Sequence, residues 1–514
     1  MTVKIKSGTF SNLEGIIVEV EVDITPGLPK FSIVGLPDAS VKESSERVRT
    51  AIINSGYHYP LGKITVGLAP AVIRKIGSLL DLPIALAILM ETNQIRQMNL
   101  DNYLVFGELS LSGDIRRVRG TLPIMLCGID NNIQNFIFPY DNINECRYNK
   151  SVNCYPFKRL IEVTEYINYE NSLPYDEYDD EDKDAVYMDF DDIIGQETAK
   201  RAMLIAASGN HNISLFGSTG CGKTMLAKAL PSILPKLTLE EEIEIAKIYS
   251  IVGLMPKVGR IGRPIRCPHH TVTKTALIGG GRYITAGEVT LAHNGVLFLD
   301  EILEFKKDVL ETLREPLEDK VVRINRLCNE QILPAKFLLT TTSNLCPCGK
   351  SDFMIINGDR ESCTCSDNEK KRYFNRMSKA IKDRIDIFAY VPRIKYEEIA
   401  ENKENTMYTS ENMRRIVMRA RDIQLERFKG TKYLYNSDIR GKDIFELCRV
   451  SSSIQFLLND YYNVASPSLR AYGKVITLAR TISDISEKKD ITEEDIFEAI
   501  SYRKDCHGNI IWVK

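Results

Sequence analysis

The feature that most constrains this chain is the glycine-rich segment 217–224, GSTGCGKT, which follows an apolar run at 213–216 and precedes a helical pattern at 225–230. Backbone N–H groups can surround a phosphate only where the chain curls tightly, which glycine permits. In this pattern the lysine reaches the β- and γ-phosphates and the next hydroxyl binds Mg²⁺. The segment therefore predicts a strand, a nucleotide-binding P-loop and a helix. The predicted contacts are Gly217, Ser218, Thr219, Gly220, Cys221, Gly222, Lys223 and Thr224.

A second nucleotide motif lies at 296–301, VLFLDE, where an apolar run ends in two carboxylates. Asp300 at the tip of such a buried strand can hold Mg²⁺, and Glu301 can polarise an attacking water. The pattern is common in buried strands by itself. Its position after a P-loop makes it specific, and it predicts a nucleotide hydrolase.

Composition limits the class of protein. The chain has 514 residues, too many for one hydrophobic core, and its length predicts three or four domains. The net charge of −2 requires any nucleic-acid binding to come from local basic patches. No apolar run reaches the length of a membrane span and the chain opens without a signal-like region, so we expect a cytoplasmic protein with no membrane partner, whose 12 cysteines are thiols or metal ligands.

The pattern of strand, helix and charge signals divides the chain into an α/β module, an acidic linker, the nucleotide-binding part and a helical C-terminal part. Strand and helix signals alternate through 1–170 and predict a compact α/β module, with strands at 15–22, 30–35 and 64–68 and helices at 40–55 and 79–91. An acidic linker is expected at 171–190, because residues 176–192 hold ten acidic side chains against Lys183. Past 392 the pattern turns helical, at 411–428, 442–450, 453–459, 468–485 and 492–502.

Two segments of the first module, VEVDITPGLPKFSIVGLPDASVKESSERVRTAI and RKIGSLLDLPIALAIL, resemble the magnesium-chelatase-like ATPases of the ComM/YifB family. The resemblance runs from about residue 18 to residue 503. It implies an α/β protein: a Lon-protease-like N-terminal domain, similar also to part of a ribosomal protein; a P-loop AAA+ core with a parallel sheet at 191–392; and a helical lid at 393–514. A peptidase with Ser78 as nucleophile is disfavoured for two reasons. Asp81 stands where the Lon protease motif has a glycine, and no lysine in 107–185 lies at the position of the base in the Lon catalytic dyad. A structural or interaction role is favoured for this domain.

The resemblance also implies roles for single residues. Ile194 and Gly195 would contact the adenine, and Asn344, after a strand at 337–341, would lie between the γ-phosphate and the attacking water. Arg384, in the segment DRID, matches an arginine finger that acts on the ATP of a neighbouring subunit, which implies a ring, a homo-hexamer. Arg470 matches the sensor 2 arginine. The alternatives are a surface ion pair of Arg384 with Asp383 or Asp386, and a surface charge at a helix N-terminus for Arg470.

Two insertions mark this branch of the family. Residues 263–295 match a helix-2 insert that points into the ring pore, and KVVRINRLCNEQILPAKF matches a pre-sensor hairpin. The basic side chains of the hairpin, Lys320, Arg323 and Arg326, are the expected DNA contacts. The alternative is that its arginines form ion pairs with Glu315, Glu318 or Asp319.

A cysteine-rich segment at 346–365 carries two C-x-C pairs, Cys346 with Cys348 and Cys363 with Cys365, separated by fourteen residues. Four thiolates can form a tetrahedral Zn²⁺ site, although C-x-C is tighter than the usual C-x₂-C spacing. The alternative is four unrelated thiols.

The resemblance therefore implies an ATP hydrolase that uses ATP and Mg²⁺. It would be a hexameric DNA helicase that promotes branch migration in homologous recombination or natural transformation, acting on single-stranded or branched DNA without sequence specificity. Two alternatives remain: a chelatase-type motor that remodels a protein, against which the Lon-like domain counts, and a nucleotide-dependent protease regulator. Glu301 and Arg384 count against a purely structural role.

Overall fold

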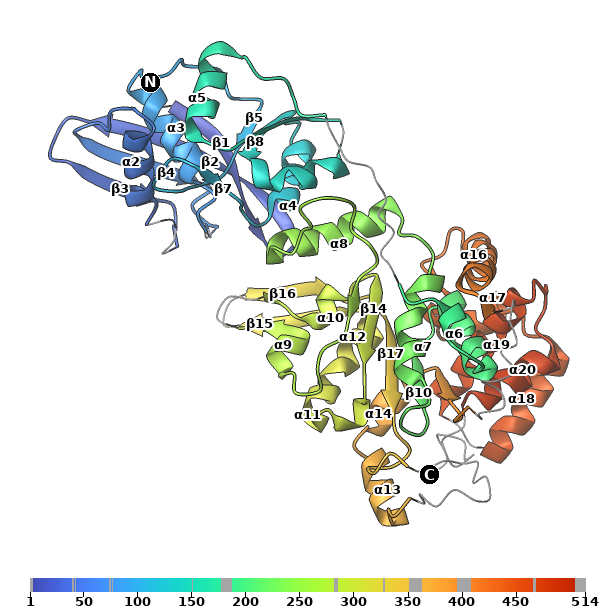
Figure 1. The fold of residues 1–514 in the computed structure, drawn as a ribbon. Coiled ribbons are helices and arrows are strands. Elements are labelled where there is room, and N and C mark those ends of the chain that lie inside the picture. The colour runs from blue at the N-terminus through green and yellow to red at the C-terminus, as the bar shows by residue number, and fades with distance from the viewer. Residues whose placement is uncertain are drawn as a thin grey trace. The chain divides into compact units, whose positions relative to one another are not determined.

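The computed structural model describes residues 3–38, 41, 43–73, 75, 77–149, 151–176, 187–281, 285–326, 329–350, 363–394, 408–465 and 468–503. The chain forms two compact units (Figure 1). The first comprises Met1–Asp184 together with Thr238–Gly262, and the second comprises Ala185–Leu237 together with Arg263–Lys514. Residues 177–186 of the expected acidic linker lie outside the described residues.

The first unit is built on a four-stranded sheet of order β1-β2-β4-β3, in which only the β3–β4 pair is parallel. Strand β2 alternates buried and exposed side chains because one face of the sheet covers the core. A three-stranded parallel sheet, β5-β8-β9, completes the unit. The elements are β1 (Val3–Ser11), β2 (Glu14–Thr25), β3 (Lys30–Val34), α2 (Ser44–Asn54), β4 (Lys63–Ala69), α3 (Asp81–Glu91), β5 (Tyr103–Val105), β6 (Glu108–Leu109), β7 (Ile115–Arg116), α4 (Thr121–Asp130), β8 (Asn135–Pro139), η1 (Tyr140–Tyr148), β9 (Asn153–Phe157) and α5 (Leu160–Tyr169).

Helix α8 (Leu239–Val252) belongs to this first unit, although the sequence patterns assign 191–392 to the ATPase core. Its Ser250 donates to buried Glu145 at 2.6 Å, and the Ser250 carbonyl accepts from the Gly120 amide at 3.0 Å. Further along, the Met255 carbonyl accepts from Arg117 at 2.7 Å. The segment therefore leaves the second unit and returns to it, anchored by contacts that no local pattern encodes.

The second unit contains a five-stranded sheet of order β11-β14-β17-β10-β18, in which every pairing is parallel. Strands β10 and β14 are buried along their whole length, as expected of strands covered on both faces. The mixed α/β class and the parallel sheet expected from the sequence are thus confirmed. The strands are β10 (Ile213–Phe216), β11 (Ile265–Arg266), β14 (Gly295–Leu299), β17 (Phe337–Ser343) and β18 (Ile387–Tyr390).

Helices and two hairpins surround this sheet. One hairpin pairs β12 with β13 inside the expected helix-2 insert, and the other pairs β15 with β16 at the expected pre-sensor position. The elements are η2 (Phe190–Asp192), α6 (Glu197–Gly209), α7 (Lys223–Ala229), η3 (Leu230–Ile233), α9 (Lys274–Ile278), β12 (Gly279–Gly280), β13 (Thr285–Ala286), α10 (Glu288–Leu291), η4 (Ile302–Glu304), α11 (Lys307–Leu310), η5 (Glu311–Leu313), α12 (Arg314–Asp319), β15 (Val321–Arg326), β16 (Asn329–Pro334), α13 (Asp367–Phe374) and α14 (Lys379–Lys382).

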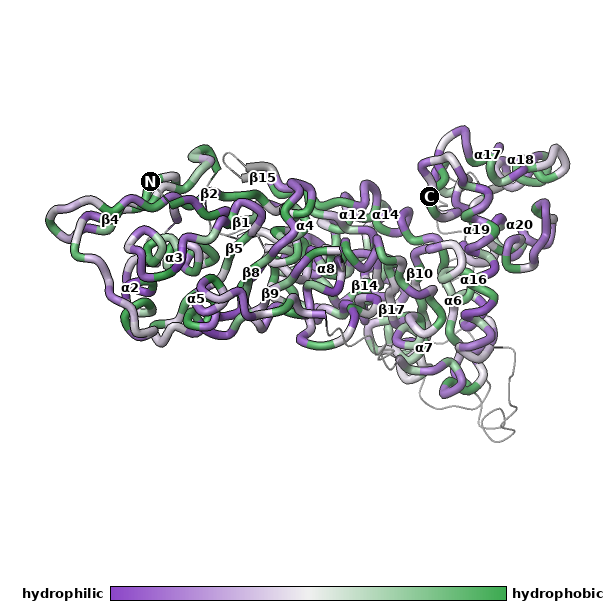
Figure 2. The backbone as a smooth tube through the Cα atoms, turned by 90° about the horizontal axis from the view of Figure 1, so that it is seen from above, coloured by the Kyte–Doolittle hydropathy of each residue, from purple (hydrophilic) through white to green (hydrophobic). Residues whose placement is uncertain are grey.

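The C-terminal part of the second unit is helical. Helix α16 alternates hydrophobic and polar stretches (Figure 2), and its buried side chains, among them Met413 and Val417, join one core with those of α6 and α19. The elements are α16 (Ser410–Arg427), η7 (Asn436–Asp438), α17 (Asp443–Leu447), α18 (Ser452–Ala465), α19 (Leu469–Ile485) and α20 (Glu493–Ser501). None of the described helices combines the length and hydropathy needed to cross a bilayer.

Candidate nucleotide site and cysteine cluster

The P-loop joins β10 to α7 at the carboxyl edge of the parallel sheet. Gly220 and Gly222 have φ of 80° and 94°, a backbone region that favours glycine, and an added Cβ at either would meet open space. The loop therefore leaves room beside its own backbone. This geometry fits the close approach of a phosphate group.

Lys223 lies inside this loop. Its Nζ donates to the Ser218 carbonyl at 2.7 Å, to the Gly217 carbonyl at 3.0 Å and to Asn344 Oδ1 at 3.1 Å. Burial lowers the pKa of Lys223, and the neighbouring Cys221, Glu301 and Asp300 oppose that shift. The ammonium group thus lies where the loop would hold an anion.

Asp300 at the end of β14 meets Thr224 at the start of α7. The Thr224 hydroxyl donates to Asp300 Oδ1 at 3.2 Å. The Thr342 hydroxyl on β17 donates to the same oxygen at 2.5 Å and accepts from the Glu301 amide at 2.8 Å. Mg²⁺ binds oxygen donors, so a hydroxyl beside a carboxylate can supply part of its coordination, with phosphate oxygens and waters supplying the rest. Thr342 was not predicted from the sequence; the only signal for it is the run of buried hydroxyl residues, TTTS at 340–343, that ends β17.

Glu301 and Asn344 face each other at this edge. Asn344 Nδ2 donates to Glu301 Oε1 at 3.4 Å, while its Oδ1 accepts from Lys223. Glu301 is exposed and has φ of 51°, an uncommon value for a residue with a side chain. Residues held in this sparsely populated backbone region cluster at functional sites.

The segment before α6 also reaches the P-loop. Gln196 Nε2 donates to the Cys221 carbonyl at 3.1 Å and to the Pro392 carbonyl at 2.7 Å. Because Ile194 and Gly195 directly precede Gln196, these bonds hold them near the P-loop, and Ile194 is 42% exposed. Gln196 is a positioning residue that sequence reasoning missed.

Arg384 and Arg470, called here the arginine pair, lie at the amino edge of the sheet, where its strands begin, opposite the carboxyl edge that carries the P-loop. Together with Asn212, which precedes β10, and Phe337, which begins β17, they line a cavity of about 490 Å³. Five residue steps separate Asn212 from Gly217, which is roughly 16 Å along an extended strand. The arginine pair and the P-loop of one chain are therefore at different places on the sheet.

Glu318 joins the arginine pair, since both guanidinium groups donate to its carboxylate. Desolvation raises the pKa of Glu318, but attraction from Arg384 and Arg470 outweighs it, and the pKa lies below its ordinary value. Arg384 also donates to the Ala380 carbonyl at 2.7 Å and to the Arg314 carbonyl at 3.1 Å. The sequence raised Glu318 only as an ion-pair partner of the hairpin arginines, and the structure pairs it with Arg384 and Arg470.

The hairpin residues expected to contact DNA lie in ion pairs where their side chains are described. Arg323 contacts both Glu315 and Asp319 at 2.8 Å, and Lys320 pairs with Asp438. The side chain of Arg326 lies outside the described residues. For Arg323, these contacts match the ion-pair alternative raised by the sequence.

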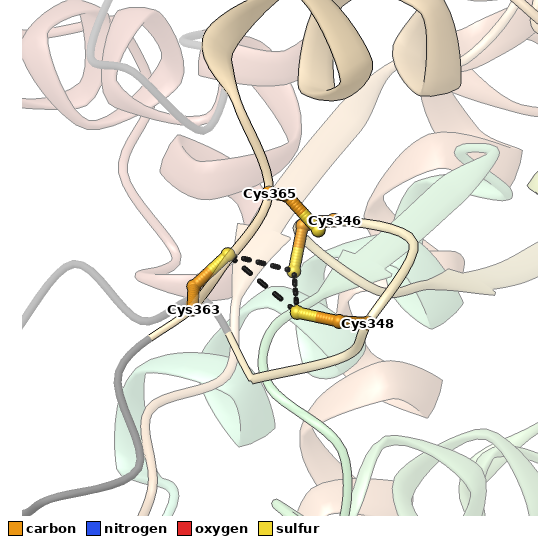
Figure 3. Close-up of side chains that lie close together, drawn as sticks. All are labelled: Cys346, Cys348, Cys363 and Cys365. Carbon is orange, nitrogen blue, oxygen red and sulfur yellow. Dashed lines mark hydrogen bonds between the residues drawn. The ribbon is translucent and has the colours of Figure 1, made fainter.

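The cysteine cluster consists of Cys346, Cys348, Cys363 and Cys365, whose sulfur atoms all lie within 4.8 Å of one another. Figure 3 shows the side chains of the two C-x-C pairs turned toward one another. Sulfur atoms are 3.2 Å apart between Cys346 and Cys348, and 3.5 Å apart between Cys363 and each of these two. Zn–S bonds of about 2.3 Å place tetrahedral thiolates about 3.8 Å apart, so the cluster fits a zinc ion.

In the first unit, Ser78 donates a hydrogen bond to Glu108, while Lys75 donates to the Leu68 carbonyl at 3.3 Å. Asp81 is buried and pairs with Arg47 at 2.7 Å. These contacts give Ser78 a carboxylate partner in place of the lysine base that a Lon-type peptidase requires.

Comparison with known protein families finds three matching models. Residues 189–399 match the model described as magnesium chelatase, subunit ChlI. Residues 20–142 match that of subunit ChlI of Mg-chelatase, and residues 407–503 match that of the ChlI C-terminal region.

Two known relatives match the chain over nearly its whole length, and a third matches part of it. YifB of Escherichia coli, an uncharacterized protein, is 37% identical over 95% of this chain and 94% of its own. The competence protein ComM of Haemophilus influenzae is 36% identical over 95% of this chain and 94% of its own. The magnesium-chelatase 67 kDa subunit of Chlorobaculum parvum is 24% identical over 30% of this chain and 23% of its own.

Proposed function

Because the chain belongs to the ComM/YifB family of magnesium-chelatase-like AAA+ proteins, we propose that it hydrolyses ATP as a hexameric motor that moves along DNA. The observation that carries the ATPase half is the meeting of Lys223, Thr224, Asp300, Glu301 and Asn344 at one edge of the sheet. Separate segments of the chain supply these side chains, and each suits one part of a nucleoside triphosphate with its metal.

Each residue at this edge would have a distinct role. Lys223 would balance the charge of the β- and γ-phosphates, and Thr224 with Asp300 would hold Mg²⁺. Mg²⁺, when bound, neutralises charge on the phosphate oxygens. Glu301 would polarise the attacking water, and Asn344 would orient it through its amide. Ile194 and Gly195 would border the adenine.

The arginine pair would complete the site of a neighbouring subunit. It lies at the amino edge, away from the P-loop of its own chain, so a phosphate within its reach would come from another copy. A finger arginine stabilises the charge that develops on the transferred phosphate. This placement supports a closed ring, since every subunit would both hold a nucleotide and serve the next one.

The DNA half of the proposal rests on two observations: a relative of the chain is a competence protein, and a hairpin of the second unit carries basic residues. The function we propose is branch migration during recombination or uptake of DNA. It is tested by the ATPase rate with forked, four-way or single-stranded DNA and without DNA. A rate unchanged by every DNA would reject it and favour the alternative of a motor that remodels a protein substrate.

The double variant Arg323→Ala, Arg326→Ala is expected to keep its basal ATPase rate and to lose DNA stimulation and strand displacement together. If the hairpin faces DNA, Arg323 exchanges its carboxylate partners for phosphates. Each lost phosphate contact should flatten the log–log salt dependence of binding by about one unit. Arg419→Ala, which removes another exposed ion pair at 3.1 Å, is the matched control. Unchanged DNA binding and unwinding in the folded double variant would reject the hairpin assignment.

For the cysteine cluster we propose a structural Zn²⁺ held by all four thiolates. Purified protein is expected to contain about one equivalent of zinc per chain, measured by mass spectrometry of the metal. The double variant Cys363→Ser, Cys365→Ser should lose it, because two sulfur ligands do not close a tetrahedral site. The control Cys127→Ser, Cys267→Ser, which changes thiols outside the cluster, should keep it. Four readily titrated cluster thiols and no zinc would contradict the proposal.

A further inference from the structure

We propose that the cysteine cluster braces the nucleotide site, so that metal bound by the cluster sets the position of the P-loop and of Asn344. This inference rests on the proposal that the cluster binds zinc and goes beyond it by assigning the metal a role in nucleotide binding. Three connections, each through backbone or packed side chains, link the cluster to the nucleotide motifs.

The first connection is between backbones. The amide of Thr219 in the P-loop donates to the Gly349 carbonyl at 2.9 Å, and the Gly349 amide donates to the Cys346 carbonyl at 3.1 Å. Gly349 has φ of 75°, and a Cβ added there would lie 2.1 Å from Thr219 Oγ1. The turn that carries the first cysteine pair therefore touches the P-loop with no room for a side chain.

The second connection runs through the strand that carries Asn344. Cys346 lies two residues after Asn344, which directly follows β17. Between them, Leu345 is 3% exposed and packs against Phe216 at the end of β10, where the P-loop begins. Movement of Cys346 would therefore displace both Asn344 and the packing beneath the P-loop.

The third connection leads from the second cysteine pair to the turn after Glu301. Cys365 precedes α13, whose first turn is closed by a capping box between Ser366 and Glu369. Beyond α13, Arg376 donates to the Leu303 carbonyl and to Glu304, each at 2.9 Å. Both acceptors lie in η4, which follows Glu301 directly.

A metal ion at the cluster would thus tie the P-loop and Asn344 to the segment that reaches the turn after Glu301. Cross-linking two chain segments restricts the conformations between them, and metal binding contributes directly to local folding. When residues that hold a site in place are released, activity or affinity commonly falls by about tenfold or more. Loss of the metal is therefore expected to weaken nucleotide binding roughly tenfold.

The test compares full-length protein before and after removal of zinc by a chelator in excess Mg²⁺, with fluorescent ATP titration to measure nucleotide affinity. Stripped protein and the variant Cys363→Ser, Cys365→Ser should both bind ATP roughly tenfold more weakly, and zinc should restore the stripped protein only. The control Cys127→Ser, Cys267→Ser should bind as wild type does. Circular dichroism confirms that each protein is folded.

A second variant tests the contact without touching a ligand. Gly349→Ala is expected to retain zinc and to lose nucleotide affinity, because its Cβ would push Thr219 aside. Stripped protein and Gly349→Ala that both bind ATP as wild type does would overturn the brace while leaving the zinc site intact. Absence of zinc from wild type would instead reject the zinc site itself, and the brace with it.

Discussion

Replacement of Lys223 by alanine is expected to weaken ATP binding by roughly 100-fold or more, because the proposed site would lose the buried ammonium that balances the phosphate charge. Glu301→Gln should bind ATP as wild type does and lose hydrolysis by about 10²- to 10⁴-fold, since it changes only the group that we propose polarises the attacking water. Equilibrium titration with a fluorescent nucleotide measures binding, and phosphate release measures hydrolysis.

The two variants separate the halves of the site. Lys228→Ala, on the exposed side of the same helix, is the matched control for Lys223 and should bind and hydrolyse ATP normally. Equal ATP affinity in wild type and Lys223→Ala would contradict the P-loop assignment. Normal hydrolysis by Glu301→Gln would remove Glu301 from the catalytic residues while leaving the binding assignment in place.

Arg384→Ala is expected to leave ATP binding by an isolated chain nearly unchanged and to reduce assembly-dependent hydrolysis by about 10³-fold or more, the effect typical of an arginine finger. Arg384 belongs to the amino edge of the sheet, so its charge would act on a neighbour's phosphate. To act on that phosphate, Arg384 would exchange its hydrogen bond to Glu318 for a hydrogen bond to a phosphate oxygen. Lys379→Ala, at the exposed start of α14 five residues before Arg384, is the matched control.

Mixing Arg384→Ala with Glu301→Gln tests whether the site is shared. A subunit of the first variant keeps its own Glu301, and a neighbour of the second variant keeps its Arg384, so some junctions in a mixed ring regain a complete site. Hydrolysis should therefore rise above that of either variant alone at intermediate mixing ratios. No recovery at any ratio would speak against a site built from two subunits, as would full activity of Arg384→Ala alone.

The sequence alone was enough to predict the elements whose signals lie within one short stretch of the chain. The P-loop was predictable because a buried strand, a glycine loop and a helix start follow one another without interruption at 213–230. Asp300 and Glu301 were predictable as a pair because the apolar run of β14 ends at them. The grouping of the two C-x-C pairs in one segment marked a candidate metal site, and the structure brings their sulfur atoms within 4.8 Å of one another, which is compatible with that prediction.

Contacts between distant segments were decided only by the tertiary structure. The strand order β11-β14-β17-β10-β18 differs from the chain order, and it puts Arg384 and Arg470 around Glu318 at the amino edge. Likewise, the contact of Gly349 with Thr219 joins segments about 130 residues apart, and Ser250 joins α8 to the first unit through Glu145. Periodicity reports which face of an element is buried, whereas the partner of that face depends on the path of the whole chain and on packing energies summed over many distant contacts.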